Sequence, residues 1–132
     1  MTRYVSGELT TPIVSSRKNP RPANIPPFAF VGELEIGLSG FWYPTSYMEL
    51  ATASVSASGP GTSALSITVL KEEPGTGRPI VIGTFSMGAT ETKQVISLND
   101  TLVSPYDKVY LASWADSGHL GVVVQIVGSM MT

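Results

Sequence analysis

The chain contains no cysteine and only one histidine, His119, among its 132 residues. Without cysteine it has no disulfide and no thiolate to act as a ligand or nucleophile. Metal sites usually combine several histidine, cysteine or carboxylate ligands, so a lone histidine does not indicate one. His119 lies in the turn-like sequence Ser-Gly-His-Leu-Gly, and we expect its side chain to be exposed. The sequence predicts no metal ion and no other cofactor.

Charge is also scarce. Asp, Glu, Lys and Arg make up 14% of the residues, and the net charge is −2. This balance argues against general nucleic-acid binding, which needs a basic surface. Such sparse charge indicates that partners cover part of the surface. No apolar run approaches 18 residues, and the start of the chain lacks the apolar segment of a signal peptide. We therefore expect no membrane partner and synthesis in a cytoplasm.

The stretch 47–69 has the clearest pattern in the chain. Apolar side chains alternate with Ser and Thr on both sides of Gly59-Pro60-Gly61. A period of two is that of a β-strand with one buried face. Proline fixes φ and glycine tolerates positive φ, so Gly-Pro-Gly predicts a turn. The sequence predicts a hairpin of two strands over residues 47–71.

Other segments show the same type of pattern, and none shows a convincing helical period. Turn signals recur about every ten residues, which is typical of an all-β sandwich. Gly83, inside an apolar run, marks a bulge or a close contact. We predict an antiparallel β-sandwich or jelly roll of about seven to eight strands. The further predicted strands cover residues 28–38, 41–43, 79–87, 91–98, 108–115 and 120–127, the last being the most apolar and therefore central.

Residues 1–27 differ from the rest in proline content and charge. They hold five of the ten prolines and four basic residues against Glu8, a net charge of +3, whereas residues 28–132 carry −5. Prolines favour extended chain. We predict two parts, an extended basic arm (1–27) and a β-sandwich domain (28–132). Two interpretations of the arm stay open: a disordered tail, or a segment that docks on an acidic neighbour in an assembly.

Motifs for catalysis are lacking. The sequence has no Gly-x-Ser-x-Gly elbow and no complete P-loop. Its local acidic groups, Glu72-Glu73 and Asp100 with Asp107, do not have EF-hand spacing. Nothing in the sequence selects two carboxylates that face one cleft, as glycoside hydrolysis requires. We predict a protein that is not an enzyme and has no catalytic residues.

Aromatic side chains are the remaining candidates for a binding site. Exposed rings can stack on sugar C–H groups, and a loop residue such as Asp116 can fix sugar hydroxyls. The alternative, which we favour, places Trp42 and Trp114 in the core or at a subunit interface. The candidate platform consists of Trp42, Tyr43, Tyr47, Tyr106, Tyr110 and Trp114.

A series of strand and turn motifs runs from Phe41 to Val127. In order these are F-W-Y-P, M-E-L-A-T-A-S-V-S-A, the Gly-Pro-Gly turn, L-S-I-T-V-L-K, P-I-V-I-G-T-F, S-P-Y-D-K-V-Y-L-A and G-H-L-G-V-V-V-Q-I-V. In these motifs, over about two thirds of its length, the chain resembles the small β-sandwich modules of tailed phages, especially those of actinobacteria. Such modules occur in head-decoration, minor tail and tail-fibre proteins.

The resemblance implies a virion structural protein, commonly a homotrimer, that contacts other virion proteins such as major capsid or tail subunits. It implies no catalytic residues. The chain has neither a long fibre shaft nor an evident receptor-binding tip. This difference favours a capsid decoration or minor tail component, located in the virion, over host recognition. The alternative function is a carbohydrate-binding module that uses exposed aromatic side chains.

Overall fold

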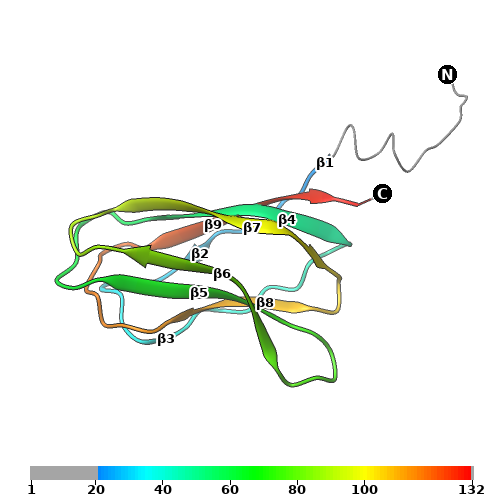
Figure 1. Ribbon diagram of the computed structural model, residues 1–132, viewed down its shortest axis with the longest axis horizontal. Coiled ribbons are helices and arrows are strands. Elements are labelled where there is room, and N and C mark those ends of the chain that lie inside the picture. Colours follow the sequence, from blue (N-terminus) through cyan, green and yellow to red (C-terminus); the bar gives the residue numbers. More distant parts are fainter. Residues whose placement is uncertain (1–20, 132) are drawn as a thin grey trace, which may run out of the picture.

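Two antiparallel β-sheets pack face to face in the computed structural model, which describes residues 21–131 (Figure 1). One sheet has the order β1-β9-β4-β7, with β2 also paired to β9, and the other has the order β3-β8-β5-β6. None of the described residues forms a helix, so none of them provides a helix suited to crossing a membrane. The predicted all-β class is confirmed. The strands are β1 (Arg21–Pro22), β2 (Phe28–Ala29), β3 (Gly37–Leu38), β4 (Met48–Ser56), β5 (Leu65–Glu72), β6 (Pro79–Met87), β7 (Lys93–Val103), β8 (Lys108–Ser113) and β9 (Val123–Met130).

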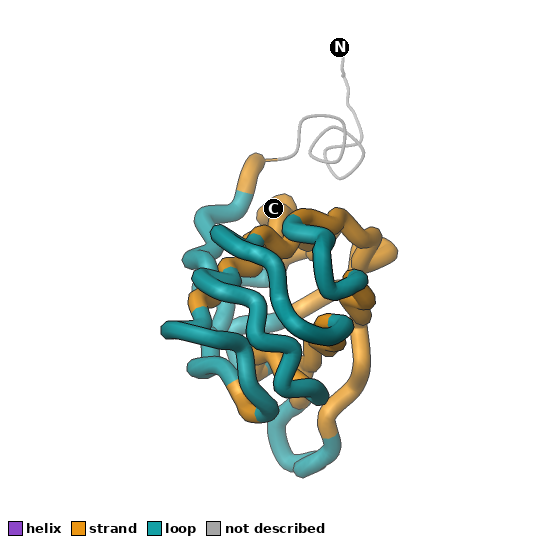
Figure 2. The backbone as a smooth tube through the Cα atoms, turned by 90° about the vertical axis from the view of Figure 1, so that its left-hand side faces the viewer, coloured by secondary structure: helices purple, strands orange, loops and turns teal. Residues whose placement is uncertain are grey.

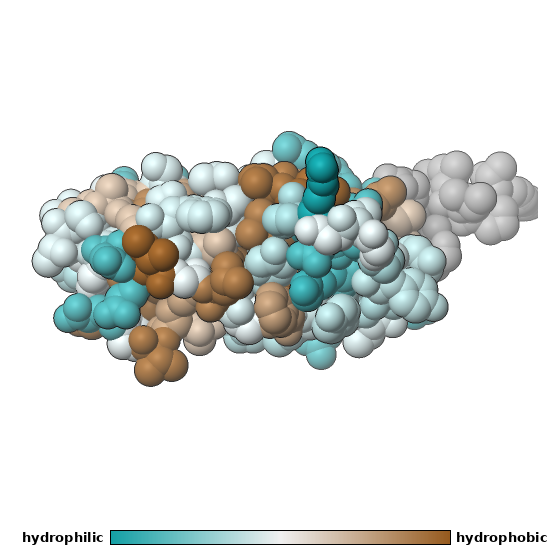
Figure 3. Space-filling model, turned by 90° about the horizontal axis from the view of Figure 1, so that it is seen from below, coloured by the Kyte–Doolittle hydropathy of each residue, from teal (hydrophilic) through white to brown (hydrophobic). Residues whose placement is uncertain are grey.

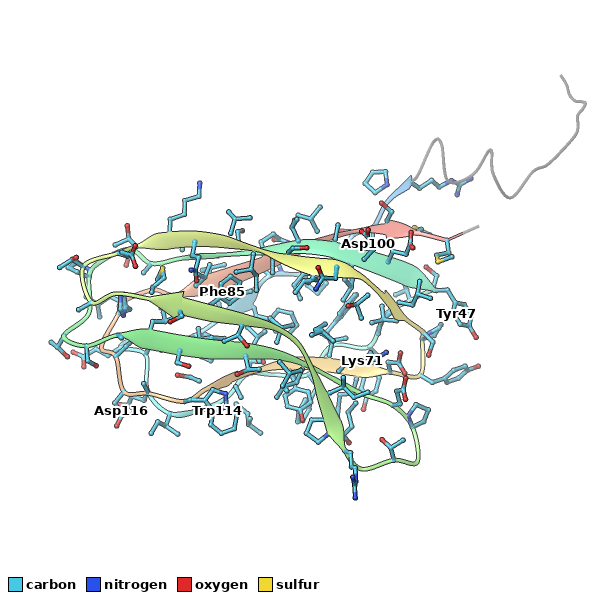
Figure 4. All side chains as sticks on the ribbon, viewed as in Figure 1. Tyr47, Lys71, Phe85, Asp100, Trp114 and Asp116 are labelled. Carbon is cyan, nitrogen blue, oxygen red and sulfur yellow. The ribbon has the colours of Figure 1, made fainter. Side chains whose placement is uncertain are left out.

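The hydrophobic core lies between the two sheets. Alternation along β4 and β5 turns one face of each strand inward, where Leu50, Val55 and Ile67 are fully buried. Phe85 of β6, also fully buried, lies between the sheets (Figure 4). β9 has strand neighbours on both sides, as its apolar sequence predicted. Burial of these side chains is the main favourable contribution to folding, because the chain has no disulfide.

The predicted hairpin at 47–71 is wrong, although both of its strands exist. β4 and β5 belong to different sheets, and residues 57–64 cross from one sheet to the other. The backbone of this connection bonds to other loops, for example from the Gly61 N–H to the Ala89 carbonyl at 2.8 Å. Neither Gly59 nor Gly61 has a positive φ. A period of two identifies a strand and its buried face, but it does not identify the neighbouring strand.

His119 is fully buried, in contrast to the predicted exposure. Its Nε2 lies 3.1 Å from the Glu91 carbonyl oxygen, and its Nδ1 lies 2.8 Å from Ser117 Oγ. A carbonyl oxygen only accepts, so Nε2 donates, and in the neutral ring Nδ1 then accepts from the Ser117 hydroxyl. His119 thereby connects two of the loops gathered at the end of the sandwich that faces the viewer in Figure 2. Gly61 has no side chain, so its loop can lie against the His119 ring. The turn-like sequence around His119 did not indicate that another loop would cover it.

Four strand predictions differ clearly from the structure in their extent. The strand predicted at 120–127 is β9, which begins at Val123 and ends at Met130, so the observed strand lies further along the chain at both ends. The strand predicted at 28–38 is divided into β2 and β3, and Gly32 between them has φ +75°. The aromatic strand predicted at 41–43 is a single bridge, from Trp42 to Val109. β7 continues beyond its predicted end at residue 98, because Asn99 and Asp100 take left-handed φ values of 55° and 51° within it. The resulting bulge lets the strand resume after an apparent turn sequence.

Gly83 fulfils both of its predicted roles. The register of β5 and β6 shifts beside it, as at a β-bulge. A Cβ at this position would lie only 2.5 Å from Cδ2 of the buried Leu98 and 2.9 Å from Cδ1 of Ile96. The absence of a side chain therefore lets β6 approach β7 closely at one side of the core.

Residues 21–27, the last part of the predicted arm, lie on the sandwich. Arg21 is paired with Met130 of β9, and the Ala23 N–H donates to the Gly128 carbonyl at 3.0 Å. Ile25 is buried in the core. The remainder of the predicted arm, residues 1–20, lies outside the described residues.

Substitution of Gly61 tests how closely the loops pack around His119. In Gly61→Ala the new methyl group would overlap the Ser117 carbonyl oxygen and the His119 ring. We expect a loss of about 1–3 kcal/mol in the free energy of unfolding, the usual cost of overpacking. The matched control is Gly59→Ala, whose Cβ would lie at an ordinary 3.6 Å from Leu120 Cδ1, with an expected change within about 0.5 kcal/mol. Equal urea denaturation midpoints for the two variants would contradict this packing.

Candidate functional site

Hydrophobic side chains cover the outer side of the β3-β8-β5-β6 sheet as well as its inner side. Val69 and Leu111 face the core, so their neighbours Leu70 and Tyr110 face outward, yet each is only 6% exposed. More than half of each surrounding apolar side chain is exposed. Figure 3 looks onto this side, where hydrophobic residues form brown groups between paler ones. We call the set the outer aromatic face; it comprises Leu38, Phe41, Leu70, Val81, Tyr110 and Trp114.

The rings near the centre of this face are held by specific contacts. Phe41 and Tyr110 pack edge to face, with ring centroids 5.1 Å apart and planes at 88°. Nζ of Lys108 lies 4.4 Å from the Phe41 ring centroid, a cation–π distance, and 3.6 Å from the Glu72 carboxylate. The Tyr110 hydroxyl donates to Glu72 at 3.3 Å. These contacts fix the rings while leaving much of Phe41 exposed.

Trp114 extends the face toward the end of the sandwich that contains His119. Its indole N–H donates to the hydroxyl oxygen of Thr68, and the side chain is 60% exposed. Asp116 lies nearby (Figure 4), but its Oδ1 accepts from the Ile36 N–H at 2.8 Å. Trp114 therefore offers an apolar ring whose only polar atom is already bonded, whereas Asp116 mainly orders a loop.

The six aromatic candidates do not form one platform. Trp42 packs against the core, as the favoured interpretation predicted, and Tyr110 is almost fully buried. Tyr43, Tyr47 and Tyr106 are exposed. Figure 4 shows Tyr47 at the end of the molecule away from Asp116. Of these six candidates, Tyr110 and Trp114 belong to the outer aromatic face, and Trp114 is the exposed one of the two.

A groove of about 610 Å³ opens at the end of the sandwich where β4 begins and β7 ends. Two charged residues on its wall are paired: Nζ of Lys71 lies 3.3 Å from the Glu73 carboxylate and donates to the Leu102 carbonyl at 3.1 Å. Asp107 is buried and accepts from the Ser104 N–H at 2.8 Å. We call this feature the end groove; its apolar lining is Tyr47, Met48, Leu102, Val103 and Met131.

Three of the four acidic candidates have structural partners: Glu72, Glu73 and, as described above, Asp107. Glu72 bonds to Tyr110 and Lys108, and Glu73 bonds to Lys71. Asp100 lies on the bulge of β7, whereas Asp107 lies in the turn before β8. Within residues 21–131 no group of three or more His, Asp and Glu side chains is suited to holding a metal ion.

The sequence interpretation did not identify Leu38, Phe41 and Leu70 as parts of a surface. A signal for Leu70 exists in the run Val69-Leu70, because successive apolar residues in a strand indicate that both of its sides are covered. Tyr110-Leu111-Ala112 in β8 has the same character. Leu38 has no such signal because its strand is very short, and Phe41 has none because it lies in the connection after this strand.

No protein-family model matches this chain, and the comparison with curated proteins also found no match. The similarity to phage β-sandwich modules therefore stays a prediction from the sequence motifs.

The burial of Tyr110 leads to a test at alkaline pH. Burial first, and then the Glu72 carboxylate, raises the pKa of its phenol above the ordinary value. Between the unfolded pKa of about 10 and the higher folded pKa, the folded state keeps a proton that the unfolded state loses. The contribution of Tyr110 to the free energy of unfolding is therefore fully present below about pH 10, and it declines as the pH rises through this interval.

We expect Tyr110→Phe to flatten this alkaline decline in the free energy of unfolding. The measurement is urea denaturation between about pH 8 and 11. Tyr106→Phe, which removes the hydroxyl of an exposed tyrosine, is the matched control. An unchanged pH dependence in Tyr110→Phe would show that this phenol does not contribute to the decline.

Proposed function

We propose that the protein is a non-enzymatic structural subunit that binds copies of itself and neighbouring proteins in a particle. By the resemblance of its motifs, the particle is a phage virion, and the subunit is a capsid decoration or minor tail component. The outer aromatic face is the observation that supports an assembly role. Apolar surface of this kind on one sheet is typical of a protein–protein interface.

A comparison of the outer sides of the two sheets also supports the outer aromatic face as the contact surface. The outer side of the other sheet carries short polar side chains such as Thr52 and Ser54 together with the exposed Val95 and Val127, and its strands β4, β7 and β9 contain no aromatic residue. The aromatic rings therefore distinguish the proposed contact surface from the other outer side. Lys108 and Glu72 are paired with each other beside the outer aromatic face. A second copy can therefore cover the aromatic rings without burying an unpaired charge from this pair.

We further propose that the sandwich is a jelly roll. When β1 and β2 are counted together as one edge strand, four antiparallel pairs link the first half of the chain to the second. The pairs are β1 and β2 with β9, β3 with β8, β4 with β7, and β5 with β6. Folding a long hairpin of such pairs into two sheets gives a jelly roll, an architecture of viral capsid and lectin domains. Fold analogy alone does not assign a function, so the proposal depends on the exposed face.

A second candidate function is carbohydrate binding, and Trp114 is the observation that favours it. Its ring is exposed and is oriented by the hydrogen bond to Thr68. We expect a bound sugar to change the Trp114 fluorescence, and Trp114→Ala to abolish the change. A titration of the full-length protein with a panel of host-surface glycans is the measurement. A panel without any fluorescence change would exclude this second function for the glycans tested.

The assembly proposal predicts that a charge on the outer aromatic face weakens self-association. Leu38→Glu places a carboxylate on the face at a position that is 62% exposed. We expect the dissociation constant of the oligomer to rise at least about tenfold, because the buried carboxylate has no partner. The matched control is Val95→Glu, at a position 61% exposed on the outer side of the other sheet, and it should leave the mass unchanged.

Light scattering at several protein concentrations measures both variants against the wild type. A wild-type trimer would agree with the phage resemblance. A wild-type monomer at all concentrations, or equal effects of the two substitutions, would contradict self-association through this face.

A further inference from the structure

We propose that the end groove binds residues 1–20 of a neighbouring copy of this chain. The inference rests on the proposed function, since it requires copies that lie next to one another. It assigns a role to a groove whose lining is mainly apolar and whose charged groups already have partners. An extended peptide segment suits such a groove, because it buries apolar side chains and needs few polar contacts from the walls.

The chain enters the sandwich at the rim of the end groove. Arg21 in β1 is paired with Met130, near the end of β9. The next residue, Met131, lines the groove, and its N–H donates to the Tyr47 carbonyl at 2.9 Å. Residues 1–20 are therefore attached beside the groove of their own copy. In the proposed assembly, residues 1–20 can therefore take part in a contact between subunits at this end of the molecule.

We assign residues 1–20 to a neighbouring copy because the proposed assembly places copies next to one another and the segment is long enough to reach between them. β1 is antiparallel to β9, so the chain reaches Arg21 from beyond the end of β9, outside the sandwich. Twenty residues span up to about 65 Å when extended, which is long enough to reach another subunit.

The composition of residues 1–20 is complementary to the groove. Three basic residues against Glu8 give the segment a net charge of +2, whereas Glu73 and Asp107 outnumber Lys71 in the groove. Opposite charges steer the encounter, and apolar contacts supply most of the affinity. The segment has one short apolar run, Pro12-Ile13-Val14, about eight residues before Arg21 in the sequence. We expect this run to contact the apolar side chains that line the groove.

Disulfide cross-linking of full-length protein tests this inference, because the natural chain has no cysteine. One population carries Ile13→Cys and a size tag, and a second carries Leu102→Cys in the groove. The two are mixed and mildly oxidised, and the mixed disulfide is measured on a non-reducing gel. The control replaces the second population with Val95→Cys, which is as exposed as Leu102 but lies on the outer side of the sheet. We expect about tenfold more mixed disulfide with Leu102→Cys, because docking raises the local thiol concentration.

The yields show whether residues 1–20 occupy the end groove of a neighbouring copy. Equal yields with Leu102→Cys and Val95→Cys would overturn the inference. So would a double variant, Ile13→Cys with Leu102→Cys, that forms a disulfide only within one chain. If wild-type light scattering shows an oligomer but the cross-link shows no preference, the groove assignment fails and the proposed function stands. A wild-type monomer at all concentrations instead contradicts the proposed function itself.

Discussion

The packing of the two inner sheet faces against each other is the interaction on which the other features depend. The chain has no disulfide, so the sheets are held by buried side chains such as Phe85 and by contacts at both ends of the sandwich. At one end the ring of the buried His119 is oriented by Ser117 of its own loop and bonds to the Glu91 carbonyl of another loop. At the other, Lys71 on one sheet donates to the Leu102 carbonyl on the other. These contacts position the outer aromatic face and the end groove on a rigid framework.

Two strands of this framework carry apolar residues on both sides. β5 and β8 contribute Val69 and Leu111 to the core, and they also contribute Leu70 and Tyr110 to the outer aromatic face. A sandwich strand usually turns polar residues to water on its outer side. The low content of charge in the sequence is consistent with this arrangement, since a surface covered by a partner does not need charge for solubility. The outer aromatic face accounts for part of the sparse charge, and it is the observation that supports the proposed assembly role.

The sequence predicted those features of the fold that depend on local patterns. The predicted bounds of β6 match the structure, and the alternation at 108–115 predicted the strand observed as β8. Pairing between strands could not be predicted in the same way, and the hairpin predicted around Gly61 is a crossing between sheets. The burial of His119 depends on three loops that are far apart in the sequence. The outer aromatic face was missed because Leu38 and Phe41 reach it from a very short strand and a connection, where alternation gives no signal.

Fluorescence quenching of Trp114 tests the central claim, that another copy of the chain covers the outer aromatic face. Trp114 is 60% exposed in the single chain, whereas Trp42, the other tryptophan, packs against the core. Acrylamide quenching is measured over a wide range of protein concentration. We expect strong quenching in dilute solution and clear protection at concentrations where the mass increases. Equally strong quenching of an oligomer and a monomer would contradict the claim, since it would show that the ring stays open to solvent after association.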